Sequence, residues 1–477
     1  MLRKTKIVAT LGPASNDRAV LEKMISAGVD VVRMNFSHGT AAEHIARVEL
    51  VRTIAADLGR TVGVLVDLQG PKIRVGKFAE GKITLKANDK FTLDATCPLG
   101  DQNRVGLDYK ELPNDVGAGD ILLLDDGRIE LIVDKVTGQE VHTTVLQGGV
   151  LSNNKGINRK GGGLTAPALT EKDMEDIKTA ASVQADFLAV SFPRSGIDMV
   201  RAGALLSSAG GKAMLIAKIE RAEAIPALED ILDASDAIMV ARGDLAVEVG
   251  DAVVPALQKR MIRLARAKNK LVITATQMME SMISSPVPTR AEVSDVANAV
   301  LDGTDAVMLS AETAAGAFPV EAVAAMARVC LEAEKEYGVD LDRTPKEASE
   351  KVVEESIAQA AIYTCRRMPI QAVAALTQSG MTPLLMSRMS TGVPIYAMTP
   401  LEETQRKVTL FRGVYPIPFA MRLSDPDQIL EDAEDELRSR GAVKDGDHII
   451  LTIGEPLGKS GGTNTMKIVR VGQHGKH

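Results

Sequence analysis

The stretch MLIAKIE (214–220) begins as an apolar strand and ends in opposite charges. Lys218 and Glu220 lie two residues apart, and alternate residues of a strand point to the same face. Ile216 shares that face, so the face is apolar where the strand starts and charged where it ends. Burying such charges is costly unless they serve one another or a ligand. The stretch therefore predicts a chemical site at the carboxyl end of a buried strand.

Similar apolar runs recur along the first three quarters of the chain, with helical patterns between most of them. With 214–220 they are KIVATLG (6–12), VVRMNFS (31–37), VGVLVDL (62–68), FLAVSF (187–192), AIMVARGD (237–244), LVITATQ (271–277) and AVMLSAET (306–313). Strand–helix alternation repeated about eight times is typical of a (β/α)8 TIM barrel. Near-continuous apolar strands also fit a parallel sheet that is buried on both faces.

Two regions break this rhythm and predict further domains. Between Leu68 and about Ala166 the helical period disappears, and segments such as KFTLDA alternate apolar and polar residues, which predicts a small all-β insert. After Tyr337 a charged stretch precedes renewed strand–helix alternation, with expected strands at VAALT (373–377), VPIYAMT (393–399), VYPIPF (414–419) and HIILTIG (448–454). This pattern predicts an open α/β C-terminal domain. We expect a barrel at 1–70 and 167–345, a β-barrel lid domain at 71–166, and an α/β effector domain at 346–477.

Composition excludes several classes of function. The 477 residues carry a net charge of -7 and 3% aromatic residues without tryptophan, which does not suit a nucleic-acid-binding protein. No run approaches the length of a membrane span, and Gly12 and Pro13 interrupt the N-terminus too early for a signal peptide. The three cysteines are widely spaced, so we expect a reducing cytoplasm and no disulfide framework.

Polar residues gather at the carboxyl ends of the predicted barrel strands. We expect the inward faces to be apolar first, at Val31, Leu65, Ile216, Val272 and Met308. We expect the same faces to end in Arg33, Asn35, Ser37, Asp67, Lys218, Glu220, Thr274, Thr276, Ser310 and Glu312. A structural alternative, in which each residue caps a helix or joins an ion pair, explains any one of them better than the whole group. In a TIM barrel such a rim carries the active site.

The residue types at this rim suggest a metal and an anion. Glu220 and Asp244 supply hard oxygen ligands, which suit Mg²⁺ or Mn²⁺. Arg33, Arg74 and Lys218 supply cations for a phosphate or a carboxylate. The chain should turn into a helix after Gly243, leaving N–H groups that can hold an anion. Phosphoryl transfer or enolate chemistry would use such a set.

Longer motifs extend this interpretation. They are RMNFSHGT (33–40), VDLQGPKIR (66–74), AKIER (217–221), MVARGDLAVE (239–248), TATQMMESM (274–282), PTRAEVSDVANAVLDGTDAVMLSAET (288–313) and SGGTNT (460–465). Over essentially the whole chain they resemble the pyruvate kinase family. The resemblance implies a glycolytic phosphotransferase that converts phosphoenolpyruvate and ADP to pyruvate and ATP with Mg²⁺, as a cytoplasmic homotetramer.

The resemblance also assigns roles to residues by position. It implies that Arg33 and Lys218 hold the phosphoryl group, that Glu220 and Asp244 bind Mg²⁺, and that Gly243, Asp244 and Thr276 bind the substrate carboxylate. Thr276, Ser310 and Glu312 match the group suspected of relaying a proton to the enolate. Nucleotide contacts match Arg74, Lys155, His38 and Asn35. Which group delivers the proton stays open.

One departure from the family pattern concerns potassium. Lys72 stands where potassium-dependent members have an acidic residue. The monovalent-site equivalents are Asn35, Ser37, Asp67 and Leu68. We expect the Lys72 ammonium to replace the ion internally, so that K⁺ is not required, although a solvated loop lysine is an alternative.

The C-terminal region suggests an effector site. IGEPLGKS resembles a P-loop, but Gly454 and Gly458 enclose three residues where that motif needs four. The resemblance instead implies a phosphate-effector site, and we expect activation by a sugar monophosphate or AMP, because Met381 stands where a base would help a second phosphate. The effector residues expected are Thr377, Gln378, Ser379, Gly380, Thr382, Lys459, Ser460 and Gly461.

Two rival functions differ from this interpretation. A Mg²⁺-dependent lyase or aldolase in a related barrel would use the same metal carboxylates but would need no ADP site. The inserted β domain with Lys155, together with Arg74, argues against this alternative. A catalytically inactive sensor would keep only the effector site and would have lost Lys218, Glu220, Asp244 or Thr276. All four are present.

Overall fold

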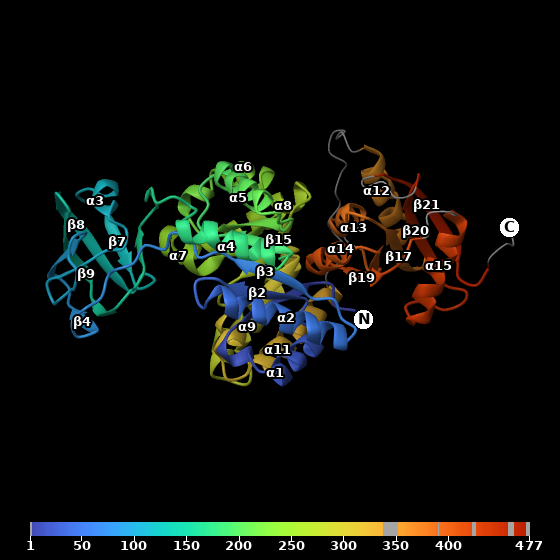
Figure 1. Cartoon of the computed structure of the whole chain (residues 1–477), viewed down its shortest axis with the longest axis horizontal. Helices are drawn as coiled ribbons and strands as arrows, with labels where there is room; N and C mark the ends of the chain where they lie inside the picture. Colours follow the sequence, from blue (N-terminus) through green and yellow to red (C-terminus); the bar gives the residue numbers. More distant parts are fainter. Residues whose placement is uncertain (1, 337–351, 390, 422–425, 457–461, 474–477) are drawn as a thin grey trace.

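The computed structural model describes residues 2–336, 352–389, 391–421, 426–456 and 462–473. The insert lies at one end of an elongated molecule, the barrel in the middle, and the C-terminal domain at the other end (Figure 1). Within the described residues, no helix is long and apolar enough to cross a membrane. The predicted effector residues Lys459, Ser460 and Gly461 lie outside the described residues.

Eight parallel strands close into the predicted barrel, in the order β1-β16-β15-β14-β13-β12-β3-β2. They are β1 (Lys6–Leu11), β2 (Val31–Asn35), β3 (Gly63–Asp67), β12 (Phe187–Val190), β13 (Met214–Ile219), β14 (Ala237–Ala241), β15 (Leu271–Ala275) and β16 (Ala306–Leu309). The register pairs Asn35 with Asp67 and Lys218 with Met239. The strand ends therefore meet at one rim, as expected for a (β/α)8 barrel.

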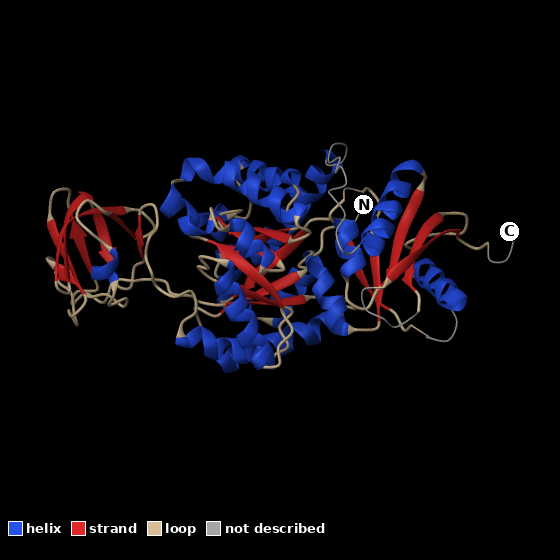
Figure 2. Ribbon diagram, turned by 90° about the horizontal axis from the view of Figure 1, so that it is seen from above, coloured by secondary structure: helices blue, strands red, loops and turns tan. Residues whose placement is uncertain are grey.

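Helices surround this barrel (Figure 2). They include α1 (Arg18–Ala27), α2 (Ala41–Asp57), α4 (Glu171–Ser182), α5 (Gly196–Ser208), α6 (Leu228–Asp233), α8 (Val254–Ala267), α9 (Arg290–Asp302) and α11 (Pro319–Glu336). The rim carries α7 (Arg242–Val249) and α10 (Ala311–Ala314), and short 3-10 turns are η1 (Pro13–Ser15), η2 (Ala222–Ala224), η3 (Asp251–Val253) and η4 (Glu280–Ile283). Capping boxes begin α2, α4 and α9, which fixes where these helices start.

Two apolar clusters separate the inside of the barrel from its outside. Val31, Leu65, Ile216 and Met308 belong to the inner cluster, as predicted from the strand pattern. The prediction was wrong for β15, because Val272 belongs to the outer cluster that packs on the helices. Leu271, Ile273 and Ala275 of β15 face inward instead. Thr274 therefore faces outward, where its hydroxyl donates to the Thr304 hydroxyl at 3.0 Å.

The insert follows β3 and is built almost entirely of strands. Its elements are β4 (Lys82–Leu85), β5 (Lys90–Asp94), β6 (Arg104–Val105), α3 (Leu112–Asp115), β7 (Ile121–Leu124), β8 (Ile129–Thr137), β9 (Glu140–Gln147), β10 (Gly149–Ser152) and β11 (Ile157–Arg159). They form a six-stranded sheet, β11-β7-β8-β9-β5-β6, and a two-stranded sheet, β10-β4, around one apolar core. The described pairings place these strands in two sheets, which confirms the predicted all-β insert. Its description as a β-barrel lid stays a prediction.

The insert returns to the barrel through three consecutive glycines. Gly161, Gly162 and Gly163 have φ angles of +83°, +83° and +96°, which L-residues with side chains rarely adopt. A Cβ at Gly162 would also lie 2.8 Å from the Glu223 carboxylate. This return connection therefore requires glycine at each position.

The C-terminal domain is an open α/β sheet in the order β19-β18-β17-β20-β21. Its elements are α12 (Val352–Arg367), β17 (Ile370–Leu376), α13 (Met381–Ser387), β18 (Ile395–Thr399), α14 (Glu402–Lys407), η5 (Val408–Leu410), β19 (Val414–Pro418), α15 (Pro426–Ser439), β20 (His448–Gly454) and β21 (Thr463–Arg470). The sequence predicted β17 to β20 but missed β21, which runs antiparallel at the edge. The fold class is confirmed, whereas the residue boundaries proposed for the three domains stay predictions.

Candidate active site

A network of buried opposite charges occupies the carboxyl end of the barrel. Asp67, which ends β3, accepts from Arg33 Nε at 2.6 Å and lies 3.3 Å from Lys218 Nζ. Lys218 Nζ also lies 2.8 Å from Glu220 Oε1 and donates to Ser191 Oγ at 2.7 Å. The Asp67 side chain is 1% exposed, and those of Arg33 and Lys218 are each 12% exposed. The predicted convergence of Arg33, Lys218 and Glu220 is therefore present in the structure.

The pKa values in this network reflect burial and mutual charge. Burial opposes the Lys218 charge, but Asp67 and Glu220 outweigh it and raise the Lys218 pKa. Burial likewise opposes the Asp67 charge, but Lys218 and Arg33 hold the Asp67 pKa below its usual value. Lys218 is therefore an ammonium, and Asp67 a carboxylate, across the physiological pH range.

Glu220 and Asp244 are the two residues predicted to bind a metal ion. Glu220 follows β13 and accepts from the Phe192 backbone N–H at 2.9 Å, while Asp244 lies in the first turn of α7. Burial raises the Glu220 pKa, Lys218 opposes this rise and the Asp244 charge adds to it, so that the Glu220 pKa is about 7. A carboxylate disfavoured by burial and by a second carboxylate gains from a shared cation, so these residues fit a divalent ion.

This pair alone would supply few of the six ligands of Mg²⁺. The described residues hold no group of three or more His, Cys, Asp or Glu side chains arranged around a metal position. Mg²⁺ usually keeps several waters and takes one or two carboxylates plus substrate oxygens. The donor set therefore fits a Mg²⁺ or Mn²⁺ that is completed by substrate and water.

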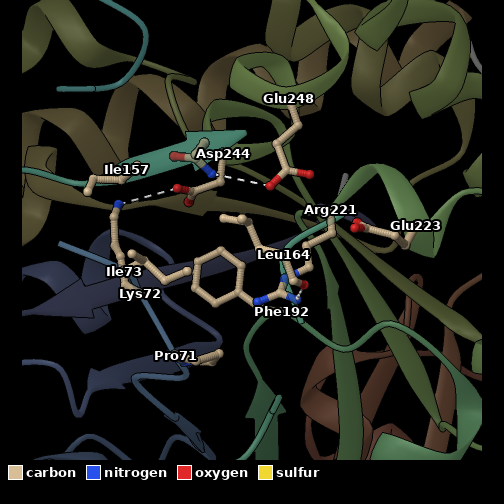
Figure 3. Close-up of a pocket in the computed structure, with 11 residues that line it drawn as sticks. Pro71, Lys72, Ile73, Ile157, Leu164, Phe192, Arg221, Glu223, Asp244 and Glu248 are labelled. Carbon is tan, nitrogen blue, oxygen red and sulfur yellow. Dashed lines mark hydrogen bonds and ion pairs between the residues drawn. The ribbon is translucent and has the colours of Figure 1, made fainter. Parts of the chain in front are cut away.

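The described ion pairs of Lys72 are with carboxylates outside the predicted monovalent site. The Lys72 Nζ is 3.3 Å from Asp244 Oδ1 (Figure 3). It is also 4.0 Å from Asp126 Oδ1. The carboxylate of the predicted monovalent site, Asp67, is neutralised by Arg33 and Lys218 instead. The described contacts do not join Lys72 to Asn35, Ser37, Asp67 or Leu68. Whether it substitutes for K⁺ stays a prediction.

Gly243 and Thr276 meet at the ends of adjacent strands. The Gly243 N–H donates to Thr276 Oγ1 at 2.9 Å, and that hydroxyl donates to the Ala275 carbonyl at 2.7 Å. Thr276 has a φ of +64°, so the chain leaves the strand geometry of β15 at this residue. This bend brings Thr276 to the rim even though Thr274 faces outward.

The candidate proton-relay residues are held by backbone contacts. Glu312 is 2% exposed, and its carboxylate accepts from the Ser310 N–H at 2.7 Å and from the Met279 N–H at 3.1 Å. These bonds connect the loops that follow β16 and β15. In this structure Glu312 positions the backbone of the rim, and its predicted part in proton transfer stays a prediction.

The predicted nucleotide residues fall into two groups. Arg74 and Lys155 lie on neighbouring segments at the base of the insert. The backbone of Arg74 forms an isolated β-bridge with Gly156, and the Arg74 guanidinium donates to the Asn154 carbonyl at 2.9 Å. Lys155 Nζ pairs with Asp125 at 2.7 Å. Asn35 and His38 belong instead to the barrel loop after β2, where the His38 N–H donates to the Asn35 carbonyl at 3.3 Å.

A cavity of about 370 Å³, open to solvent, lies where the insert meets the barrel rim (Figure 3). Its lining residues are Pro71, Lys72, Ile73, Ile157, Asn158, Leu164, Phe192, Arg221, Glu223, Asp244 and Glu248. Glu248 of the barrel connects the insert to the barrel. Its carboxylate accepts from the side chain of Asn158 in the insert at 3.3 Å and from the Ala222 N–H of the barrel at 2.8 Å. Asp244 thus borders a cleft between insert and barrel.

Sequence reasoning missed several residues that shape this rim. Arg242 pairs with Asp295 at 2.7 Å and donates to the Ala275 and Thr276 carbonyls, which fixes the end of β15. Its position directly before Gly243 was a usable signal. Ser191 and Glu248 gave no such signal, because their partners are distant in sequence.

The predicted effector loop forms a tight turn before α13. Thr377 Oγ1 accepts from the Gly380 N–H at 2.8 Å, and Ser379 Oγ accepts from the Met381 N–H at 3.3 Å. The Gln378 carbonyl accepts from the Thr404 hydroxyl at 2.6 Å. Thr382 is buried, and its hydroxyl contacts Glu354 and Thr463 at 3.0 and 2.6 Å. Phosphate binding at this loop stays a prediction.

Fold and rim together define a class: a (β/α)8-barrel enzyme with cations and a carboxylate pair that suit a phosphorylated, metal-bound substrate. Comparison with known proteins narrows this class. Residues 2–323 match the family model described as "Pyruvate kinase, barrel domain", and residues 355–469 match "Pyruvate kinase, alpha/beta domain". The chain belongs to the pyruvate kinase family, whose members are kinases that transfer phosphoryl groups.

Individual relatives agree with this assignment. The chain is 54% identical to pyruvate kinase II of Salmonella typhimurium over 98% of this chain and 99% of the relative. It is 55% identical to a pyruvate kinase of Haemophilus influenzae over 95% and 96% of the two chains. A crystal structure of a pyruvate kinase from Cryptosporidium parvum superposes with a TM-score of 0.91 at 34% identity, covering 98% and 96%. These findings do not support the rival lyase or aldolase.

Proposed function

We propose that this chain transfers the phosphoryl group of phosphoenolpyruvate to ADP at the barrel rim, giving pyruvate and ATP. The carrying observation is the Lys218 ammonium, which lies 3.3 Å from Asp67 and 2.8 Å from Glu220 beside Arg33. An ammonium fixed in this position would stabilise the negative charge that develops on a phosphoryl group during its transfer. Preorganised charge of this kind is usually the largest catalytic contribution.

Arg33 and Lys218 bind the phosphoryl oxygens in this proposal. Asp67 fixes both side chains, and Thr10 Oγ1 accepts from Arg33 at 3.0 Å, so neither cation must reorganise when substrate binds. Glu220 and Asp244 would hold a Mg²⁺ or Mn²⁺, which supplies further positive charge to the substrate oxygens. Gly243, Asp244 and Thr276 orient the substrate carboxylate beside them.

The remaining predicted residues serve the nucleotide and the enolate. Arg74 and Lys155 approach the ADP phosphates from the insert, while Asn35 and His38 approach from the barrel loop. The hydroxyls of Thr276 and Ser310 are the candidate groups for relaying a proton to the enolate. The Glu312 carboxylate accepts from the Ser310 backbone N–H and so fixes the position of Ser310. Water exclusion by the insert would favour phosphoryl transfer to ADP over hydrolysis.

The test separates phosphoryl transfer from enolization by changing one side chain. In Lys218→Met we expect ATP formation to fall by about 10³-fold, because one preorganised charge is lost. We expect enolization of added pyruvate, followed by exchange of its methyl protons with deuterium, to survive. Lys178→Met is the control, because Lys178 is 65% exposed and pairs with a 72% exposed Glu175. Equal loss of both activities in Lys218→Met would contradict the proposed role.

We also propose that turnover does not require K⁺, with Lys72 as the internal cation. The support is that Lys72 lies within the rim charges, 3.3 Å from Asp244. The assay compares turnover in a K⁺-free buffer with an inert counterion before and after K⁺ addition. Strong activation by K⁺ would refute this part.

We further propose that a phosphorylated effector regulates this protein and that the protein assembles as a homotetramer. The turn at Thr377–Thr382 offers hydroxyls and an N-terminal helix end to a phosphate, which supports activation by a sugar monophosphate or AMP. Such monophosphates should shift the phosphoenolpyruvate saturation curve to lower concentration, and an unmoved curve would exclude the effector site. By family analogy we propose a homotetramer, which light scattering would measure.

A further inference from the structure

The loop that joins β2 to α2 carries one of the predicted nucleotide residues. We call it the β2 loop and define it as residues 36–39. His38 is exposed in this loop, whereas Phe36 is 2% exposed. Two side chains from flanking helices contact its backbone carbonyls. His44 Nε2, on α2, lies 2.8 Å from the His38 carbonyl, and Lys172 Nζ, on α4, donates to the Phe36 carbonyl at 2.7 Å. The backbone that presents His38 is therefore held from two helices.

His44 is packed as a core residue although its side chain is polar. It is 3% exposed, and its ring stacks on the Phe36 ring with centroids 4.1 Å apart and planes inclined by 14°. A carbonyl oxygen can only accept, so Nε2 carries the proton and donates to the His38 carbonyl. Nδ1 is buried and has no hydrogen-bond partner among the described residues. The described hydrogen bond of this imidazole therefore goes to the β2 loop.

The surroundings of this imidazole keep it neutral. Burial lowers the His44 pKa, the hydrogen bond to His38 opposes this, and the Arg47 charge lowers the pKa further. A proton on Nδ1 would be a buried donor without an acceptor, which is costly. At neutral pH His44 is therefore a neutral donor with a fixed tautomer.

An apolar ring would fill the space of His44 at a lower cost. Phenylalanine would keep the stacking on Phe36 and would bury no unpaired nitrogen. The imidazole adds its bond to the His38 carbonyl, and it does so while Nδ1 is buried without a partner. The residue type at position 44 therefore favours a role in fixing the β2 loop over a role in packing alone.

The two ends of the β2 loop are held in different ways. At its start the Phe36 N–H donates to the Asp67 carbonyl at 2.9 Å, so the barrel fixes this end. At its other end Gly39 has a φ of +83°, and a Cβ there would lie 3.4 Å from His44 Nε2. The chain thus passes close to α2 at Gly39, which brings the His38 carbonyl within reach of His44.

Lys172 is the second anchor of the loop and the weaker one. Its side chain is 46% exposed, and its Nζ also pairs with Asp176, one turn further along α4. Exposed charged contacts of this kind contribute little. We therefore expect the loss of Lys172 to matter less than the loss of His44.

We propose that His44 is a positioning residue for the nucleotide, which holds the β2 loop so that Asn35 and His38 meet ADP in the correct orientation. This inference rests on the proposed function, in which these two residues contact ADP. His44 is buried and acts through the His38 backbone, without touching the substrate. Fixing a binding group before the ligand arrives reduces the cost of ordering it on binding.

The test separates the hydrogen bond from the packing by exchanging His44 in two ways. His44→Phe keeps an aromatic ring against Phe36 but lacks the donor, whereas His44→Gln keeps an N–H donor near the Nε2 position but lacks the ring. Calorimetry with ADP and Mg²⁺ measures nucleotide affinity, and thermal unfolding measures stability. We expect His44→Phe to weaken ADP binding by about three- to tenfold, the size of one net hydrogen bond, with little change in melting temperature. We expect His44→Gln to unfold at a lower temperature and yet to bind ADP nearly as well as the wild type.

Steady-state kinetics give a second readout. His44→Phe should raise the KM for ADP and leave the KM for phosphoenolpyruvate unchanged, because Arg33 is fixed by Asp67 and not by the β2 loop. Lys172→Met should raise the KM for ADP by a smaller factor. Arg47→Met is the control on α2, because the Arg47 guanidinium donates to Asn16, outside the loop, at 2.9 Å. It should leave both KM values unchanged.

The outcomes distinguish this inference from the proposed function. A wild type that binds ADP but forms no ATP would refute the proposed function and leave this inference standing. Unchanged ADP affinity in His44→Phe would overturn this inference, as would a loss of affinity that follows the melting temperature in both His44 variants. His44→Leu removes the donor with a smaller side chain and replaces His44→Phe if that variant does not fold. A wild type that does not bind ADP would overturn both proposals.

Discussion

At the scale of single residues, Asp67 organises the rim. It is the one described carboxylate that contacts both Arg33, at 2.6 Å, and Lys218, at 3.3 Å, and it is 1% exposed. Without it the two cations would face each other in a poorly hydrated site. A buried charge that loses its partner is strongly destabilising, whereas an exposed pair contributes little.

The variant Asp67→Asn should therefore lower the free energy of unfolding by about 3–5 kcal/mol. The Lys218 pKa should also fall, because Asp67 is the larger of the two carboxylate contributions that raise it. Thermal and urea unfolding measure the stability. Asp57→Asn is the matched control, because Asp57 forms an ion pair with Arg18 in which both side chains are exposed, Arg18 by 49% and Asp57 by 60%. This control should change the free energy of unfolding by less than about 1 kcal/mol. Similar small losses in both variants would contradict this account.

A second residue-scale prediction concerns pH. Burial lowers the pKa of Lys6 to about 8, while its Nζ donates to the Val414 carbonyl at 2.6 Å and lies over the Tyr415 ring. In the unfolded chain this lysine has its ordinary pKa of about 10.5, so the unfolded chain binds more protons between pH 8 and 10.5. The Lys6 contribution to the free energy of unfolding therefore rises with pH across this window, by up to about 3 kcal/mol.

Comparison with Lys6→Met isolates this contribution, because the other titrating groups are common to both proteins. The difference in unfolding free energy, wild type minus variant, should increase between pH 8 and 10 and stay level between pH 6 and 7. A difference that stays constant from pH 6 to 10 would show that Lys6 titrates normally in the folded state.

Residue types at the rim could be predicted from sequence, but their partners could not. The strand period placed Arg33, Asp67, Lys218 and Glu220 on inward faces, and the structure brings them together. The same period could not show that Lys72 would pair with Asp244, because that contact spans 172 residues and depends on how the insert meets the barrel. Periodicity reports the direction of a side chain, whereas ion pairs depend on long-range geometry.

At the scale of elements, strand and helix ends decide where the site residues lie. The inward pattern predicted for β15 failed at Val272, because the chain reaches the rim through positive φ angles at Thr276 and Gln277, +64° and +54°. A period of two holds only while the backbone stays extended. The edge strand β21 was missed because half of its length alternates weakly between exposed and partly buried residues.

Helix α9 offers a test at this scale. The hydroxyl of its N-cap residue Thr289 accepts from the Glu292 N–H at 3.2 Å, and the Glu292 carboxylate accepts from the Thr289 N–H at 2.7 Å. The same carboxylate also accepts from the Ser281 N–H. We expect Thr289→Ala to lower the free energy of unfolding by about 1 kcal/mol and Thr289→Ser to restore most of it. Chemical denaturation measures both. Equal stability of the alanine and serine variants would show that the cap hydroxyl contributes nothing.

At the scale of the whole molecule, the C-terminal domain is joined to the barrel by a buried ion pair. Arg388 and Asp305 are both 0% exposed, and Asp305 also accepts from the Val272 N–H at 2.9 Å. Arg388 directly follows α13, and Asp305 directly precedes β16. It therefore couples the position of the C-terminal domain to a strand of the catalytic barrel.

Removing one partner should cost far more than removing both. We expect Arg388→Met to lower the free energy of unfolding by about 3–5 kcal/mol, and the double variant Arg388→Met/Asp305→Asn to recover a substantial part. Limited proteolysis and thermal unfolding follow whether the two domains separate before the barrel unfolds. Additive losses in the double variant would show that the pair does not hold the domains together.

The three glycines at 161–163 also restrict how this protein can be engineered. The outgoing segment enters the insert through Pro71, whereas the return segment needs left-handed backbone at three successive residues beside the Glu223 carboxylate. Grafting an insert from a homologue would therefore succeed only if the transplanted piece brought this triplet with it or left it in place. An exchange that replaced the triplet with a conventional linker should misalign the cleft even if both modules folded correctly.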